Sequence, residues 1–167
     1  MRAMTEKNLQ DAFAGESQAH VKYQLFSDVA EKEGLANVAR LFKAVAHAEL
    51  VHARNHLNEL AGLKDSSGNL QQAIDGETFE VKEMYAAYYE VAKLQGERGA
   101  QRSSRYAMEA EKIHATMYVT AKDKVDAEED IVLKTIQVCE VCGHTVEGDA
   151  PDKCPICEAP AGKFTGF

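Results

Sequence analysis

The sequence has few residues that break helices and no stretch that could cross a membrane. Its 167 residues include three prolines and no tryptophan, and all three prolines lie after residue 150. No stretch approaches the roughly 18 uncharged apolar residues of a membrane span. The first seven residues lack the apolar core of an export signal. These absences argue against a membrane protein and predict a largely helical, cytoplasmic one.

Positive charge is also scarce. Nineteen Lys and Arg residues face twenty-seven Asp and Glu residues, and the formal net charge is −8. Such a chain repels phosphate backbones, so nucleic acid is not an expected partner.

Cysteine is absent from the first 138 residues, and all four cysteines lie in the last 29. A disulfide framework is not favoured because no export signal is present. The change in composition instead predicts two domains, residues 1–131 and residues 132–167.

The first domain has apolar residues at helical spacing. The expected helices are residues 5–33, 35–60, 75–95 and 100–128. Gly34, Gly62 and Gly96 stand at expected helix ends. Residues 63–73 are rich in Ser, Asn and Gly and are expected to connect two helical hairpins. The predicted fold is mainly α, a four-helix bundle followed by a small second domain.

Two of the expected helices carry the pattern Glu-x-x-His, as Glu49 with His52 and Glu111 with His114. A spacing of three residues places both side chains of a pair on one helix face. One such pair easily arises by chance, but both of these lie on the second helix of a hairpin.

The other two helices carry acids at matching levels. Counted from the turns, Glu16 lies at the level of Glu49, and Glu80 lies at the level of Glu111, with Glu77 one turn from Glu80. One Glu from each of two helices and Glu-x-x-His from the other two is the ligand set of ferritin-like di-metal bundles.

The chemistry of these residues suits two metal ions. Carboxylates can bridge neighbouring cations, and imidazole favours iron or zinc over magnesium or calcium. The alternative interpretation is that these Glu residues are solvated acids on the protein surface. His20, one turn from Glu16, fits a supporting or packing role better than ligation, and Tyr23 on the same face fits either a hydrogen bond or packing. A swap of hairpins between two chains would satisfy the sequence as well as a single-chain bundle.

The second domain contains Cys139-x-x-Cys142 and Cys154-x-x-Cys157, separated by eleven residues. This spacing predicts a tetrahedral thiolate metal site. A domain this small needs the metal for its stability. Zinc and iron both fit the spacing, and iron would make the site a one-electron carrier.

These motifs together resemble the rubrerythrin family over essentially the whole chain. The resemblance includes Gly76-Glu77-x-x-Glu80, then Met84-Tyr85, and the Cys-x-x-Cys-Gly and Cys-Pro-x-Cys turns of the tail. It implies a ferritin-like di-iron bundle followed by a rubredoxin-like domain with one iron.

The resemblance also implies a role for each ligand. Glu49 and Glu111 are the implied bridging ligands of the two irons. The implied terminal ligands are Glu16 on the first iron and Glu77 with His114 on the second, and the ligands implied to exchange on the first iron with redox state are Glu80 and His52. The implied ligands of the single iron in the second domain are Cys139, Cys142, Cys154 and Cys157. Tyr23 and Tyr85 are expected to hydrogen-bond ligand carboxylates.

The implied function is that of a non-haem di-iron peroxidase that reduces hydrogen peroxide to water in oxidative-stress defence. Electrons would come from NAD(P)H through an external donor such as rubredoxin or a rubredoxin reductase. A homodimer or higher homo-oligomer is expected, because head-to-tail chains bring one chain's four-cysteine iron near the other's di-iron site, whereas a single chain would leave them far apart. The alternatives are a ferritin-like iron-oxidising or iron-storage protein and a zinc-stabilised structural module.

Overall fold

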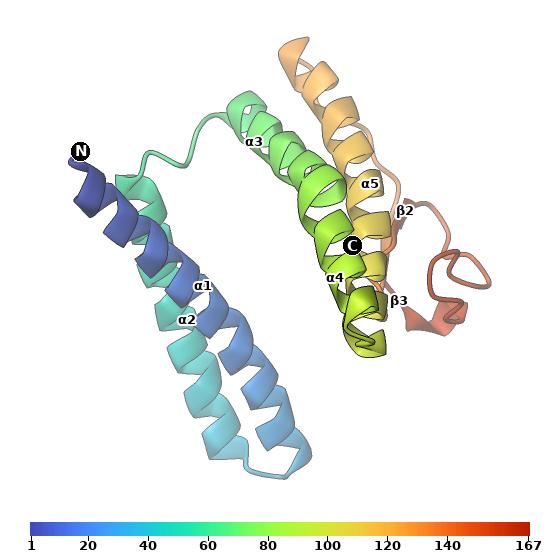
Figure 1. Ribbon diagram of the computed structural model, residues 1–167, viewed down its shortest axis with the longest axis horizontal. Coiled ribbons are helices and arrows are strands. Elements are labelled where there is room, and N and C mark those ends of the chain that lie inside the picture. The colour runs from blue at the N-terminus through green and yellow to red at the C-terminus, as the bar shows by residue number, and fades with distance from the viewer. The chain divides into compact units, whose positions relative to one another are not determined.

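The computed structural model describes all 167 residues as two compact units, residues 1–64 and residues 65–167. The first unit is a hairpin of α1 (Ala3–Lys32) and α2 (Ala36–Glu59) (Figure 1). Gly34 closes the turn with a φ of +78°, a value that glycine adopts without strain. No helix of the chain is both long enough and apolar enough to span a membrane.

Small side chains hold α1 and α2 close together. Ser27 and Ala30 of α1 are buried, as are Ala39, Ala46 and Ala53, which recur every seven residues along α2. The Ser27 hydroxyl donates to the Ala39 carbonyl at 2.9 Å and so ties the two helices together.

The second unit begins with a rod made of α3 (Ser66–Phe79), a π-helical turn (Glu80–Met84) and α4 (Tyr85–Leu94). α5 (Arg98–Asp126) packs along this rod. The prediction that residues 63–73 form a connection is wrong from Ser66 onward. Asp65 caps the helix by accepting a hydrogen bond from the Gly68 N–H at 2.8 Å, and this cap allows helix to form through Ser- and Gly-rich residues.

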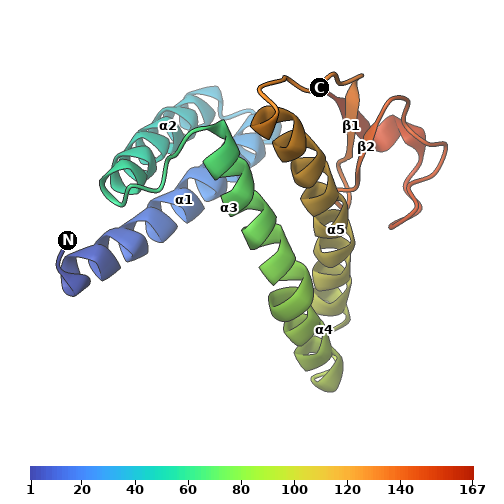
Figure 2. The ribbon, with the colours of Figure 1, turned by 90° about the horizontal axis from the view of Figure 1, so that it is seen from above.

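The chain ends in a three-stranded antiparallel sheet of order β2-β1-β3. Its strands are β1 (Ile136–Cys139), β2 (Thr145–Glu147) and β3 (Phe164–Gly166), with a 3-10 turn (Ala161–Lys163) before β3. The sheet lies beside α5 (Figure 2). Tyr106 of α5 packs against the cysteine cluster, and Gly143 lies near Ala110, where a Cβ on Gly143 would be in ordinary van der Waals contact with the Ala110 Cβ at 3.8 Å.

Candidate metal centres

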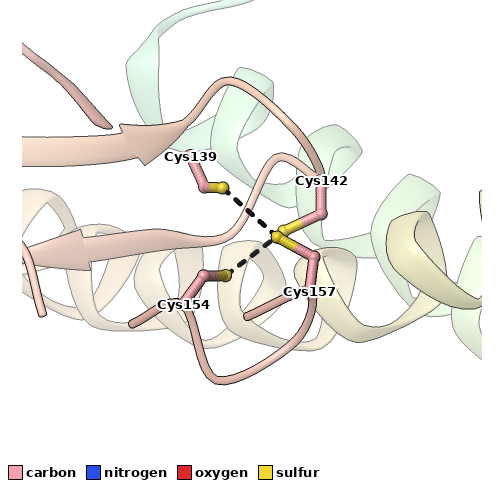
Figure 3. A group of neighbouring side chains, drawn as sticks. All are labelled: Cys139, Cys142, Cys154 and Cys157. Carbon is pink, nitrogen blue, oxygen red and sulfur yellow. Dashed lines mark hydrogen bonds between the residues drawn. The ribbon is translucent and has the colours of Figure 1, made fainter. Parts of the chain in front are cut away.

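The four cysteines converge from two segments of the small sheet domain, the end of β1 with the turn that follows it and the loop between β2 and the 3-10 turn (Figure 3). The Cys139 and Cys157 sulfurs are 3.6 Å apart, the Cys142 and Cys154 sulfurs are 3.4 Å apart, and all four lie within 4.8 Å of one another. A tetrahedral ion with metal–sulfur bonds of about 2.3 Å requires sulfurs about 3.8 Å apart. The cage therefore has the size of a four-thiolate metal site, as the sequence predicts.

Hydrogen bonds in the second cysteine loop favour the thiolate form of Cys154, whereas burial raises the pKa of the Cys157 thiol. Burial alone would raise the pKa of the Cys154 thiol. Hydrogen bonds from the backbone at Cys157 and Ile156, together with those of the Cys142 and Cys157 side chains, outweigh burial and lower the pKa to about 7. A thiolate is the form that binds a metal ion.

A first carboxylate–histidine cluster lies on the α1–α2 hairpin. Its ligand atoms come from Glu16, Glu49 and His52 and lie within 4.8 Å of one another. The His52 Nδ1 is 2.9 Å from a Glu49 carboxylate oxygen and 3.9 Å from one of Glu16. The helix levels counted from the sequence are thus correct for this hairpin.

Tyr23 and His20, which lie near this cluster, make contacts within the hairpin instead of contacts with the carboxylates. Tyr23 contacts the rings of Phe26 and Phe42 and makes no hydrogen bond to a carboxylate. The His20 Nδ1 lies 2.7 Å from the Ala46 carbonyl oxygen, so this side chain joins α1 to α2.

A second cluster lies in the other unit, between the α3–α4 rod and α5. It contains Glu77, Glu111 and His114, and the His114 Nδ1 is 2.5 Å from a Glu111 carboxylate oxygen. Burial, together with the hydrogen bond and charge of Glu111, raises the pKa of Glu77 to about 7. Burial and Glu111 also raise the pKa of Glu80. Carboxylates crowded in this way suit a bound cation, which would remove their mutual repulsion.

The π-helical turn directs Tyr85 toward these carboxylates. The sequence indicated Tyr85 but did not predict the turn. In a regular α-helix, Tyr85 would point about 80° away from Glu77. The one extra residue of the π turn reduces the offset to about 20°. Burial and the charges of Glu80 and Glu111 raise the pKa of Tyr85, which therefore stays protonated beside them.

The second cluster also contacts the cysteine domain of its own chain. The His114 Nε2 lies 2.9 Å from the hydroxyl oxygen of Thr145, three residues after Cys142. The expectation that a single chain leaves its four-cysteine site far from its carboxylate site is therefore wrong for this cluster. β2 follows the first cysteine pair directly and packs on α5 within one compact unit.

Comparison with known proteins agrees with these clusters. Residues 7–122 match the family model described as rubrerythrin, and residues 137–165 match that of the rubrerythrin rubredoxin-like domain. The chain is 41% identical to Rubrerythrin-2 of Clostridium acetobutylicum, over 99% of this chain and 97% of that protein. It is 33% identical to Nigerythrin of Nitratidesulfovibrio vulgaris, over 98% of this chain and 86% of that protein.

Solved structures give the same relationship. The fully reduced, all-ferrous state of nigerythrin aligns with a TM-score of 0.56 at 33% identity, covering 98% of this chain and 86% of that one. Together with the clusters, these matches assign a rubredoxin-like four-cysteine site and a di-iron carboxylate site to the chain.

Proposed function

The chain belongs to the rubrerythrin family, and on that premise we propose that it reduces hydrogen peroxide to water as part of oxidative-stress defence. The reaction consumes one peroxide, two electrons and two protons and releases two waters. Iron bound at the carboxylate site would supply the two electrons that break the O–O bond. The observation that supports this proposal most is the contact of His114 with Thr145, which joins a carboxylate–histidine cluster to the domain that holds the four-thiolate cage of the same chain.

The di-iron site would be formed by both carboxylate–histidine clusters. Each contains one histidine and at least two carboxylates, which is half of a two-iron ligand set. Glu49 and Glu111 would bridge the irons, Glu16 would be a terminal ligand of one iron, and Glu77 with His114 would be terminal ligands of the other. Glu80 and His52 would exchange on the first iron with its redox state, because the anionic ligand suits the more highly charged ion.

Residues around the ligands would orient them. The Tyr85 phenol would donate a hydrogen bond to a ligand carboxylate, and its raised pKa keeps that proton in place. Tyr23 would support the first cluster in the same way only if it left its packing against Phe26 and Phe42.

The four-cysteine iron would pass electrons inward one at a time. They would come from an external protein such as rubredoxin or a rubredoxin reductase, with NAD(P)H as their source and the cytoplasm as the compartment. A storage protein needs no such relay, which counts against the iron-storage alternative.

We further propose that the chain acts as a homodimer or a higher homo-oligomer, with or without exchange of hairpins. Several large apolar side chains of the α1–α2 hairpin are about half exposed, among them Val21, Leu25, Phe26 and Val29. A run of apolar surface of this kind along a helix favours burial against another helix.

A single-turnover experiment tests the peroxidase proposal. The iron-loaded full-length protein is reduced without oxygen, freed of reductant and mixed with two equivalents of peroxide per chain. We expect the visible absorption of the ferric four-cysteine iron to return as peroxide disappears. Persistent bleaching with intact peroxide, or a colourless protein holding zinc in the cysteine site, would contradict the proposal. Uptake of many irons per chain would favour storage instead.

A further inference from the structure

We propose that Thr145 is a positioning residue that holds His114 with its proton on Nε2 and its Nδ1 facing the metal. Thr145 begins β2 and is only 8% exposed. Its hydroxyl oxygen lies 2.9 Å from the His114 Nε2 and 3.0 Å from the Gly143 carbonyl oxygen. The inference rests on the proposed role of His114 as an iron ligand.

The direction of these two hydrogen bonds follows from counting protons. A hydroxyl has one proton to donate, and the Gly143 carbonyl can only accept. The Thr145 proton therefore goes to Gly143, and the hydroxyl accepts from His114. His114 must then carry a proton on Nε2.

The other ring nitrogen of His114 is consequently the one available to a metal ion. The Nδ1 lies 2.5 Å from a Glu111 carboxylate oxygen and belongs to the cluster with Glu77. A cation held by the Glu111 and Glu77 carboxylates would lie within reach of the lone pair on this nitrogen. Partners on the second nitrogen of a ligating histidine set its tautomer and ring orientation.

The two Glu-x-x-His motifs differ in this respect, although their spacing is identical. The close contacts of the His52 ring are at Nδ1, with Glu49 and Glu16, and the side chain is 53% exposed. Within the α1–α2 hairpin, no residue hydrogen-bonds its Nε2. Thr145 thus gives His114 a fixed orientation that no residue of the α1–α2 hairpin gives His52.

The same hydroxyl ties His114 to the first cysteine pair. Gly143, which accepts the Thr145 proton, directly follows Cys142, and its own N–H donates to the Cys139 carbonyl at 2.9 Å. The two hydrogen bonds of the Thr145 hydroxyl therefore fix the position of His114 relative to the loop that carries Cys139 and Cys142.

The test uses Thr145→Val, which keeps the shape of the side chain and removes the hydroxyl. Thr145→Ser retains the hydroxyl and should behave as the wild type. Thr165→Val is the matched control, because Thr165 is an exposed threonine of β3 in the same sheet. If Thr145→Val loses the wild-type circular dichroism spectrum, Thr145→Ala removes the same hydroxyl without adding a methyl group.

Proton NMR of the fully reduced, iron-loaded protein measures the predicted bond directly. We expect two exchangeable, hyperfine-shifted imidazole N–H resonances, one of which exchanges slowly with solvent because a buried hydroxyl accepts it. Thr145→Val should abolish the slow exchange, whereas Thr145→Ser and Thr165→Val should preserve it. Competition with a chromogenic Fe(II) chelator should show one ferrous ion bound about tenfold more weakly in Thr145→Val.

Two results would overturn the inference, and they have different meanings. If Thr145→Val keeps both the slow N–H exchange and the wild-type Fe(II) affinity, Thr145 does not position His114, and the peroxidase proposal is unaffected. If the wild type itself binds no ferrous ion through imidazole and shows no shifted N–H resonance, the di-iron proposal fails, and the role of Thr145 fails with it.

Discussion

Glu77 shares a small volume with Glu80 and Glu111, and this crowding determines how the metal-free protein should respond to pH. The pKa of Glu77 is about 7 in the folded chain, against 4.5 as its ordinary value. Between these pH values the folded state binds more protons than the unfolded state. Raising the pH through this window therefore destabilises the folded state.

We predict that the melting temperature of the metal-free protein falls as pH rises from about 4.5 to about 7, measured by thermal unfolding in chelator. Glu77→Gln, which cannot ionise, should reduce this dependence. Loading with iron should do the same, because the metal takes the place of the proton. A wild-type melting temperature that rises through the window would contradict the prediction.

Glu80 is proposed as a ligand that exchanges with redox state, and its replacement should affect peroxide turnover without affecting the fold. It starts the π turn, is partly buried, and has its pKa raised by burial and by Glu111. We predict that Glu80→Ala lowers peroxide turnover by about tenfold or more while helical circular dichroism is unchanged.

Glu83→Ala is the matched control for Glu80→Ala, because Glu83 lies in the same π turn and is exposed. It should leave turnover near the wild-type value. Unchanged anaerobic reoxidation of Glu80→Ala by peroxide would remove Glu80 from the reaction.

At the scale of helices and strands, close packing depends on small residues rather than on large apolar ones. The face of α2 toward α1 buries Ala39, Ala46 and Ala53, and the buried residues of α1 are Ser27 and Ala30. Side chains of this size leave little room for added methylene groups between the helices.

We predict that Ala46→Leu destabilises the folded chain by about 1–3 kcal/mol through overpacking. Ala44→Leu makes the same chemical change at an exposed position two residues away and should have a small effect. Chemical denaturation of both variants checks the difference. Equal midpoints for Ala46→Leu and the wild type would show that α1 and α2 are not packed as closely as described.

Sequence patterns predicted the elements unevenly. The Gly34 turn and the two helices beside it were placed within two residues of their observed bounds, because glycine and apolar periodicity act locally. The start of α3 was misplaced by about nine residues, since Ser66, Ser67 and Gly68 also suit a turn and only the Asp65 cap makes them helical. The π turn was missed because no residue type specifies it.

At the scale of the whole molecule, the C-terminal sheet depends on its metal. Its buried hydrophobic core consists of Cys139, Cys142 and Cys154, with partly buried side chains around them. A core of thiols has little apolar area to bury, so metal binding must supply much of the folding free energy.

We predict that Cys154→Ser loses the visible absorption of the four-cysteine iron and the ordered structure of the sheet domain while the helices remain folded. Donor-dependent peroxide turnover should fall with the absorption, because the electron relay is lost. Val141→Ser is the control, since Val141 is 49% exposed between the first two cysteines. Visible absorption, circular dichroism and turnover are measured on both, and normal turnover in a colourless Cys154→Ser protein would exclude the relay.

The sequence by itself determined the chemistry of this protein. Glu-x-x-His on a helix and Cys-x-x-Cys in a turn each fix their side chains within a few residues, so residue type and spacing are enough to predict metal ligands. Only the tertiary structure decided that the Glu77, Glu111 and His114 cluster meets the cysteine domain of the same chain. That contact joins His114 to Thr145 across 31 residues. It depends on how β2 packs against α5, which no local pattern encodes.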